Sequence, residues 1–299
     1  MSKNKSLRGR AIAVLAIAGA LGAAAIPAAV AAPATPAHGH HHFALGALPD
    51  PAAQQSGGAA LAPHALAPAA TVPASVDLSN YLPQVGDQGQ VGSCVAWAID
   101  YSAIGILEGE QGIQGAPHAP MYTYAQIARG DDQGSYASQH FKILTSQGLD
   151  TKADYWQGDF DYTTQPTAAE KTNAAHWKLS GYTALRTGSS LQSEIKTSLA
   201  KGQPVVFAFE VYQSLEDITP ATAANYSYYP TSGELAGQPL GGHEVAIVGY
   251  NSQGVKIANS WGSSWGANGY FTVPWRFVTN QIEEADAVGS IVNTGGGVY

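Results

Sequence analysis

The sequence predicts an α+β protein whose first half is mainly helical and whose second half is mainly antiparallel sheet, with a site where the two halves meet. Before Trp177, apolar residues recur at helical spacing; after it, short runs rich in β-branched and aromatic residues alternate with glycine-rich turns. Helices and strands that segregate along a chain are typical of the α+β class. Sites tend to form where two such halves meet.

Residues 1–31 have the pattern of a secretory signal peptide. Four basic residues among the first ten precede an apolar run over 11–26, and small residues end at Ala31. A membrane anchor is the alternative, but Pro27 interrupts a run that is short and weakly apolar for a bilayer span. We therefore expect cleavage after Ala31, a secreted or extracellular protein, and no membrane span afterwards.

The charge argues against nucleic acid as a partner. The chain has 14 basic and 22 acidic side chains, and the signal segment holds four of the basic ones, so the mature chain would carry 14 − 4 − 22 = −12. Nucleic-acid binding needs a clustered basic face, which this composition does not offer. The oligomeric state is left open by the sequence.

Residues 32–73 read as a low-complexity leader of alanine, proline and histidine, too poor in large apolar residues to order strongly. A histidine cluster in it could hold a metal, but no acidic or thiol partner is nearby, so a solvated polar patch is favoured and no metal or cofactor is expected. The cluster comprises His38, His40, His41 and His42. The folded domain should span 74–299, with a helical lobe over about 90–176 and a sheet lobe over about 177–299.

The expected helices and strands follow from the spacing of apolar residues and from the positions of capping and turn residues. Helices are predicted over 94–107, 121–129 and 138–146. A short helix should begin at a capping box of Ser189 and Gln192 and end at Gly202. Strands are predicted over 205–212, 244–250, 255–258 and 269–273.

Cys94 is the only cysteine, so it forms no disulfide within the chain. A lone cysteine in an exported protein is either buried and inert or kept for its reactivity. The glycine-rich approach places Cys94 at the start of a helix, where the helix dipole stabilises a thiolate. His243 and Asn259, 16 residues apart, could orient each other on one hairpin and leave a ring nitrogen for the thiol.

These residues carry a family resemblance. Gln88 and Cys94 lie in Q-G-Q-V-G-S-C, and Asn259 begins N-S-W-G-S-S-W-G-A-N-G-Y sixteen residues after His243. In these motifs the chain resembles the papain-like cysteine peptidases, and its lack of disulfides is closest in character to their bacterial members. The resemblance covers about 72–273. It implies a papain-like fold of two lobes, a helical N-terminal lobe and an antiparallel β-sheet or barrel-like C-terminal lobe, with the active-site cleft between them.

The resemblance also implies roles. Cys94 would be the nucleophile, His243 its ion-pair partner and later the acid that protonates the leaving amine, Asn259 the residue that orients His243, and Trp261 a shield over that hydrogen bond. Gln88 would donate into the oxyanion hole. The substrate would be bound along Gly92, Gly134, Ser135 and Gly242. The implied reaction is hydrolysis of a peptide bond through a thioester acyl-enzyme.

Some features depart from that family pattern. Val95 stands where tryptophan usually follows the nucleophile, and residues 32–73 do not look like the long helical inhibitory segment of many relatives. Glu244 stands where an apolar residue is common, and we assign it no catalytic role because it should face away from His243. The alternative functions are a non-hydrolytic surface binding module and an acyl-transfer peptide ligase, for which the tyrosine-rich loop 225–230 could be a recognition surface.

Overall fold

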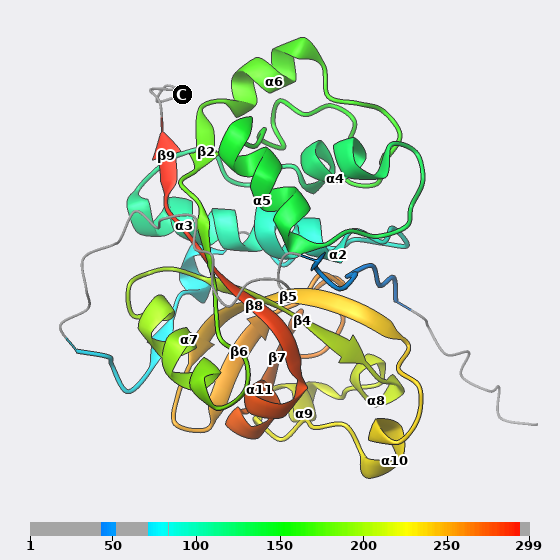
Figure 1. Ribbon diagram of the computed structural model, residues 1–299, viewed down its shortest axis with the longest axis vertical. Helices are drawn as coiled ribbons and strands as arrows, with labels where there is room; N and C mark the ends of the chain where they lie inside the picture. Colours follow the sequence, from blue (N-terminus) through cyan, green and yellow to red (C-terminus); the bar gives the residue numbers. More distant parts are fainter. Residues whose placement is uncertain (1–42, 52–70, 83, 294–299) are drawn as a thin grey trace, which may run out of the picture. The chain divides into compact units, whose positions relative to one another are not determined.

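The computed structural model describes residues 43–51, 71–82 and 84–293 (Figure 1). The predicted signal peptide and the histidine cluster at positions 38–42 lie outside these residues. No helix of the described part combines the length and hydropathy that a membrane crossing requires.

One buried helical rod is the centre of the helical lobe. It comprises α2 (Cys94–Ala96), the π-helical stretch η2 (Trp97–Ala103) and α3 (Ile104–Gln111). Gly112 ends it in the left-handed conformation, with a φ of 65°, which glycine adopts without a steric penalty. The helix predicted over 94–107 is therefore present and runs one turn further.

Three further helices complete the helical lobe, and two of them, α4 and α5, contact this rod directly. They are α4 (Pro120–Ala128), α5 (Ala137–Ser146) and α6 (Ala168–Ala174). Pro120 suits the first turn of α4, where no backbone N–H partner is needed, and Thr167 with Glu170 forms a capping box for α6. In Figure 1 these helices lie together on one side of the sheet.

The sheet lobe is a seven-stranded antiparallel sheet in the order β3-β8-β4-β5-β6-β7, and β1 pairs with β5 at the side. The described strands do not close into the barrel-like form, because β3 and β7 stay at opposite ends of this order. The strands are β1 (Val76–Asp77), β3 (Tyr182–Ala184), β4 (Val205–Val211), β5 (Gly241–Tyr250), β6 (Gly254–Ala258), β7 (Tyr270–Pro274) and β8 (Ile282–Val288).

Short helices border the sheet: η1 (Ser79–Tyr81), η3 (Gly188–Ser190), α7 (Leu191–Leu199), α8 (Gln213–Glu216), α9 (Pro220–Ala223), α10 (Ser232–Leu235) and α11 (Trp275–Gln281). The predicted capping box at Ser189 is wrong. A 3-10 turn precedes α7, whose N-cap is Ser190 and makes no side-chain capping bond.

The sheet separates two hydrophobic cores. Along β4, Val205, Phe207 and Phe209 face the core that includes α7 and α11, whereas Val206 and Ala208 face the core of the helical lobe. This alternation is the two-residue period of a strand covered on both faces. The division at residue 177 is not clean, because the short strand β9 (Ile291–Asn293) returns to pair with β2 (Trp177–Leu179) beside α3.

Candidate active site

Cys94 begins the central rod and is fully buried. The preceding turn is fixed by the Gly92 amide, which donates to both oxygens of the Asp132 carboxylate at 3.0 and 3.1 Å. The rod packs against β5, the strand that carries His243. Hydrogen bonding from the amide of Glu244, the next residue on that strand, reaches the Cys94 thiol. The cysteine and the histidine strand are therefore in contact.

His243 and Asn259 form one hydrogen-bonded pair between β5 and the end of β6. The Nε2 atom of His243 lies 2.7 Å from Asn259 Oδ1, and the Ser260 amide donates to the same oxygen at 2.8 Å. Because this oxygen is an acceptor, Nε2 carries the proton and Nδ1 keeps its lone pair. Nδ1 is buried and has no hydrogen-bond partner among the described residues.

Trp261 covers this pair. Its ring stacks on the His243 ring, with centroids 4.7 Å apart and an interplanar angle of 24°. Trp265 meets Trp261 edge to face at 5.0 Å. His243 and Asn259 are at most 2% exposed as a result.

Gln88 is held with its amide toward the start of the rod. Its Nε2 donates to Val91 O at 3.0 Å, and its Oε1 accepts from the Ser260 hydroxyl at 2.7 Å. A primary amide has two N–H groups, so one remains for a further acceptor. The amide orientation is fixed by these two bonds.

Residues 43–50 lie in the cleft between the lobes. The Ser135 amide donates to Gly46 O at 2.9 Å, the Leu48 amide donates to Ser135 O at 2.9 Å, and the Ala47 amide donates to Gly242 O at 3.1 Å. Ala47 and Ser135 form a parallel β-bridge. The segment thus binds by its backbone, as an extended peptide would.

Glycines on both sides allow this close approach. A Cβ on Gly46 would lie 2.0 Å from Gly92 O, one on Gly134 would lie 2.3 Å from Gly46 O, and one on Gly242 would lie 2.3 Å from Ala47 O. The structure therefore brings the four residues expected to line a substrate site, Gly92, Gly134, Ser135 and Gly242, around one segment of the chain itself.

Side chains anchor the segment at its two ends. Phe43 stacks on Trp261 with centroids 4.6 Å apart, and Trp261 Nε1 donates to Ala44 O at 3.3 Å. At the other end, the Ser138 amide and hydroxyl donate to the Asp50 carboxylate at 2.7 and 3.0 Å. For residues 43–51, a part of the predicted leader that the structure describes, this differs from the expectation of weak order. Composition averaged over 32–73 hid Phe43, its one large aromatic residue, and Gly46, which fits against Gly92.

With the segment in place, the thiol and the imidazole are both neutral at neutral pH. Burial raises the pKa of Cys94 to about 12; the negative charge of Glu244 adds to this, and backbone hydrogen bonds from Glu244, Val95 and Gly46 oppose it. Burial lowers the pKa of His243 to about 4, against the hydrogen bond with Asn259. Burial in this covered state therefore favours the neutral forms of both groups over the ion pair that the resemblance implies.

A comparison with known protein families identifies the family of this chain. The family model described as papain family cysteine protease matches residues 72–288. The chain belongs to the papain family. It is a cysteine peptidase by that membership, and its fold is the α+β fold that the sequence predicted.

Relatives in several kingdoms are similar to this papain-family chain. An uncharacterized peptidase C1-like protein of Acanthamoeba polyphaga mimivirus is 28% identical over 214 residues, covering 67% of each chain. A cathepsin L-like proteinase of Fasciola hepatica is 28% identical over 217 residues, 67% of this chain and 59% of its own.

Solved structures show the same fold. The crystal structure of xylellain, a cysteine protease from Xylella fastidiosa, matches with a TM-score of 0.66 and 24% identity over 84% of this chain and 97% of its own. Digestive procathepsin L 3 of Tenebrio molitor matches with a TM-score of 0.56 and 21% identity, over 76% and 73% of the two chains.

Proposed function

We propose that this protein is an exported endopeptidase that uses Cys94, His243 and Asn259 as a catalytic triad and is held inactive by residues 43–50. One observation carries the proposal. The hydrogen bond from His243 Nε2 to Asn259 Oδ1 leaves the basic Nδ1 atom unpartnered on the strand that contacts the Cys94 thiol.

In the first half of the reaction, the Cys94 thiol gives its proton to His243 Nδ1 and the sulfur attacks the carbonyl carbon of the peptide bond. Gln88 Nε2 and the Cys94 amide donate to the oxyanion of the tetrahedral intermediate. The C–N bond then breaks, the leaving amine takes the proton from Nδ1, and a thioester to Cys94 remains.

In the second half, a water gives a proton to Nδ1 and its oxygen attacks the thioester carbon. Collapse of the second intermediate releases the carboxylic acid product, and the thiolate recovers the proton from the imidazolium. Trp261 keeps bulk water from the bond between His243 and Asn259, and this preserves the tautomer.

Residues 43–50, which we call the covering segment, block each of these steps. The segment occupies the backbone donors and acceptors of Ser135 and Gly242 that a substrate would use, and it excludes water from Cys94. Rehydration of the thiol and the imidazole on its departure brings both pKa values back toward their usual range. We therefore propose that the segment is inhibitory and that its removal activates the enzyme.

Gly46→Ala tests the inhibitory contact. A methyl group at Gly46 would overlap Gly92 O, so the segment should leave the cleft and Cys94 should react with a peptide-like electrophile about tenfold faster or more at pH 7. Gly233→Ala is the matched control, since its Cβ would meet only one atom, at 3.9 Å. Mass spectrometry locates the adduct, and equal rates in the two variants would refute inhibition by residues 43–50.

Cys94→Ala tests the nucleophile itself. In the Gly46→Ala background it should abolish hydrolysis of a peptide library while circular dichroism stays unchanged. Retained turnover would assign the nucleophile to another residue. Internal as opposed to terminal cleavage sites in the same library establish the endopeptidase mode.

Export rests on the sequence pattern of residues 1–31. The proposal predicts that cells release the protein without these residues, and N-terminal sequencing of protein from the culture medium measures this. Recovery of an N-terminus at Met1 would contradict it.

The tyrosine-rich loop 225–230 gives little support to the ligase and binding-module alternatives. In the tyrosine-rich loop, Tyr228 is 5% exposed and packs on Phe277, and the Tyr229 hydroxyl accepts from Gln281. This loop is part of the core packing more than a recognition surface. Product analysis with an added amine distinguishes the reactions, because a ligase would give more aminolysis than hydrolysis.

A further inference from the structure

Four polar side chains form one hydrogen-bonded row through the core of the helical lobe. They are Asp100 of η2, Thr123 of α4, His140 of α5 and Ser135 in the loop before α5, and each is 0% exposed. The Nε2 atom of His140 lies 2.9 Å from Ser135 Oγ. On the other side of the ring, Nδ1 lies 2.9 Å from Thr123 Oγ1 and 3.3 Å from Asp100 Oδ2. We call these four residues the buried polar row.

The buried polar row is costly in these surroundings. Ile99, Tyr124 and Phe141, which are its neighbours in the sequence, all belong to the hydrophobic core of this lobe. Burial raises the pKa of Asp100, and the nearby His140 opposes this. One carboxyl oxygen of Asp100, Oδ1, has no hydrogen-bond partner among the described residues. Apolar residues would fill the same space without such a penalty, so the row indicates a role beyond packing.

The directions of the hydrogen bonds hold the His140 ring in one orientation. The Thr123 hydroxyl donates its single hydrogen to Asp100 Oδ2, so Thr123 Oγ1 can only accept from the ring. The Nδ1 atom of His140 therefore carries a proton. In the neutral imidazole Nε2 is then an acceptor, and the Ser135 hydroxyl donates to it. The Ser135 side chain is thus anchored to a ring that two other side chains hold.

The backbone of Ser135, unlike its side chain, faces the cleft. Its amide donates to Gly46 O and its carbonyl oxygen accepts from the Leu48 amide, both at 2.9 Å. An anchored side chain fixes the peptide groups on either side of it. A main-chain site that is fixed in advance binds an extended chain at a lower entropic cost.

The opposite end of the row belongs to the helical rod that begins at Cys94. Asp100 lies six residues after Cys94 in the sequence, within the π-helical stretch η2. Widened turns of this kind are rare in helices and frequent at functional sites. The row therefore connects the rod that bears the thiol with the residue that binds a peptide backbone in the cleft.

Serine, histidine and aspartate in this order also form the triad of serine hydrolases. The serine of such a triad must reach the carbonyl carbon of its substrate. The Ser135 hydroxyl is instead turned toward the His140 ring, and both residues are 0% exposed. This placement favours a positioning role over nucleophilic attack.

We propose that His140, held by Asp100 and Thr123, is a positioning residue that fixes Ser135 for any extended chain in the cleft. For a substrate the proposal rests on the proposed peptidase function, whereas for the covering segment it rests on the two backbone hydrogen bonds of Ser135. Loss of the row should weaken the binding of both occupants. The covered protein should then open more readily, and the uncovered protein should bind peptides less tightly.

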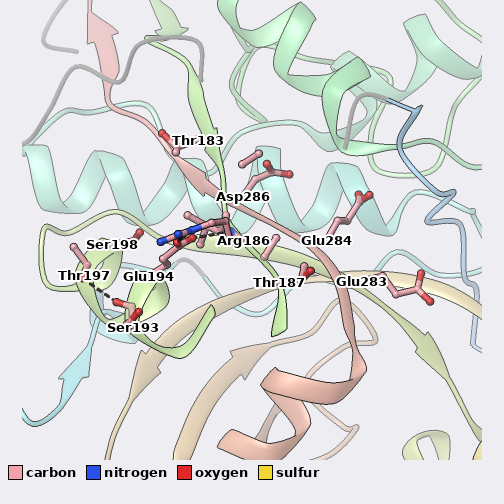
Figure 2. Close-up of a pocket in the computed structure, with 13 residues that line it drawn as sticks. Thr183, Arg186, Thr187, Ser193, Glu194, Thr197, Ser198, Glu283, Glu284 and Asp286 are labelled. Atoms are coloured by element: carbon pink, nitrogen blue, oxygen red, sulfur yellow. Dashed lines mark hydrogen bonds and ion pairs between the residues drawn. The ribbon is translucent and has the colours of Figure 1, made fainter. Parts of the chain in front are cut away.

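Ser135→Ala and His140→Gln test this in the full-length protein with Gly46 intact. The Leu48 amide should exchange its hydrogen about 3- to 10-fold faster in Ser135→Ala, because a hydrogen bond that orients its acceptor is lost. His140→Gln keeps an amide near Ser135 and loses only the Nδ1 contacts, so its effect should be smaller. The matched control Ser193→Ala removes an exposed hydroxyl on α7, beside a hollow of about 860 Å³ that Ser135 does not line (Figure 2), and should leave the exchange unchanged.

The second arm uses the Gly46→Ala protein, whose cleft is proposed to be open. In this background Ser135→Ala should raise KM for an extended peptide about 3- to 10-fold and change kcat by less than twofold. Alkylation of Cys94 by a peptide-like electrophile should slow by the same factor relative to iodoacetamide, which is too small to span the cleft. With Gly46 intact, iodoacetamide should instead react faster after Ser135→Ala. General loosening of the fold would accelerate iodoacetamide in both backgrounds and would overturn the proposal.

The remaining outcomes separate this proposal from the peptidase function. Unchanged Leu48 exchange in both variants, with melting curves that show them folded, overturns the role of the row. A fall in kcat at unchanged KM, or a fluorophosphonate adduct that mass spectrometry locates on Ser135, also overturns it, because the row would then act on the chemistry. If no peptide is hydrolysed in any background, the peptidase function falls, and the exchange of Leu48 still decides the row.

Discussion

At the scale of single residues, hydrogen bonds from neighbouring residues fix the orientation of the His243 and Gln88 side chains. Asn259 accepts from both His243 and Ser260 through one oxygen, and this fixes the imidazole tautomer. Ser260 then holds Gln88, so the proposed oxyanion donor and the proposed base are positioned by consecutive residues of one loop. A substitution at Asn259 should therefore disturb the orientation of the His243 ring without removing the ring itself.

Asn259→Ala should lower kcat/KM by about 100-fold in the Gly46→Ala background, because the imidazole then rotates away from productive geometry. Steady-state kinetics measures this, with the exposed Asn280→Ala as control. Undiminished activity would show that Trp261 alone orients His243.

Gln88→Ala should lower kcat by about 100- to 1000-fold with little change in KM, as expected for a donor used only in the transition state. Thermal melting accompanies the kinetics, because Gln88 is also buried and hydrogen-bonded to Ser260. A raised KM at unchanged kcat would assign Gln88 to substrate binding instead.

At the scale of elements, the covering segment meets the acidic strand β8. The acidic groups around Glu284 are Asp50 on the segment, Glu283 and Asp286 on its own strand, and Glu244 on β5. Burial raises the pKa of Glu284 to about 7, so its neutral form is favoured when the cleft is covered. Departure of the segment rehydrates the Glu284 carboxyl group and lowers its pKa. The population of the uncovered state relative to the covered state therefore increases as the pH rises toward 7.

The segment should accordingly exchange its amide hydrogens faster at pH 8 than at pH 6, after correction for the intrinsic rate. The amides of Ala47 and Leu48 report this, because both donate to cleft carbonyls. Glu284→Gln should remove most of the pH dependence. A pH-independent corrected rate in the unmodified protein would separate the segment from the titration of β8.

Elements with strong local signals were predictable. Apolar residues recur with the helix period after Cys94 and with the strand period between Val205 and Pro274, and spacing singled out the residues that we propose as a triad. Strand β8 and helix α11 were missed, because I-E-E-A-D-A-V puts acids where a buried strand usually has apolar residues. Only the sheet register shows that Glu284 and Asp286 share the face that meets the helical lobe. Neither could spacing show that residues 43–50 return to the cleft.

At the scale of the whole molecule, no disulfide supports the fold, since Cys94 is the one cysteine in the sequence. Stability comes from two cores on either side of the sheet and from the returning strand β9, which Gln111 holds by bonds to the backbone of Ile291 at 2.8 and 3.0 Å. Redox conditions should therefore act on activity and not on folding.

Mild peroxide should inactivate the Gly46→Ala protein without changing its melting temperature, and dithiothreitol should restore activity lost to sulfenic acid. The protein with Gly46 intact should resist, because its thiol is buried and protonated. Activity assays with parallel melting curves measure both effects. A fall in melting temperature on thiol reduction would contradict a disulfide-free fold.

The covering segment belongs to the same polypeptide as the cleft it fills, and this changes what a substrate must compete against. A covalently attached occupant presents a local concentration on the order of millimolar, whatever the protein concentration in the medium. Dilution therefore does not uncover Cys94, and a peptide at micromolar concentration displaces little of the segment. Activity would then be confined to molecules whose segment has been cut or expelled, and each molecule would be activated separately.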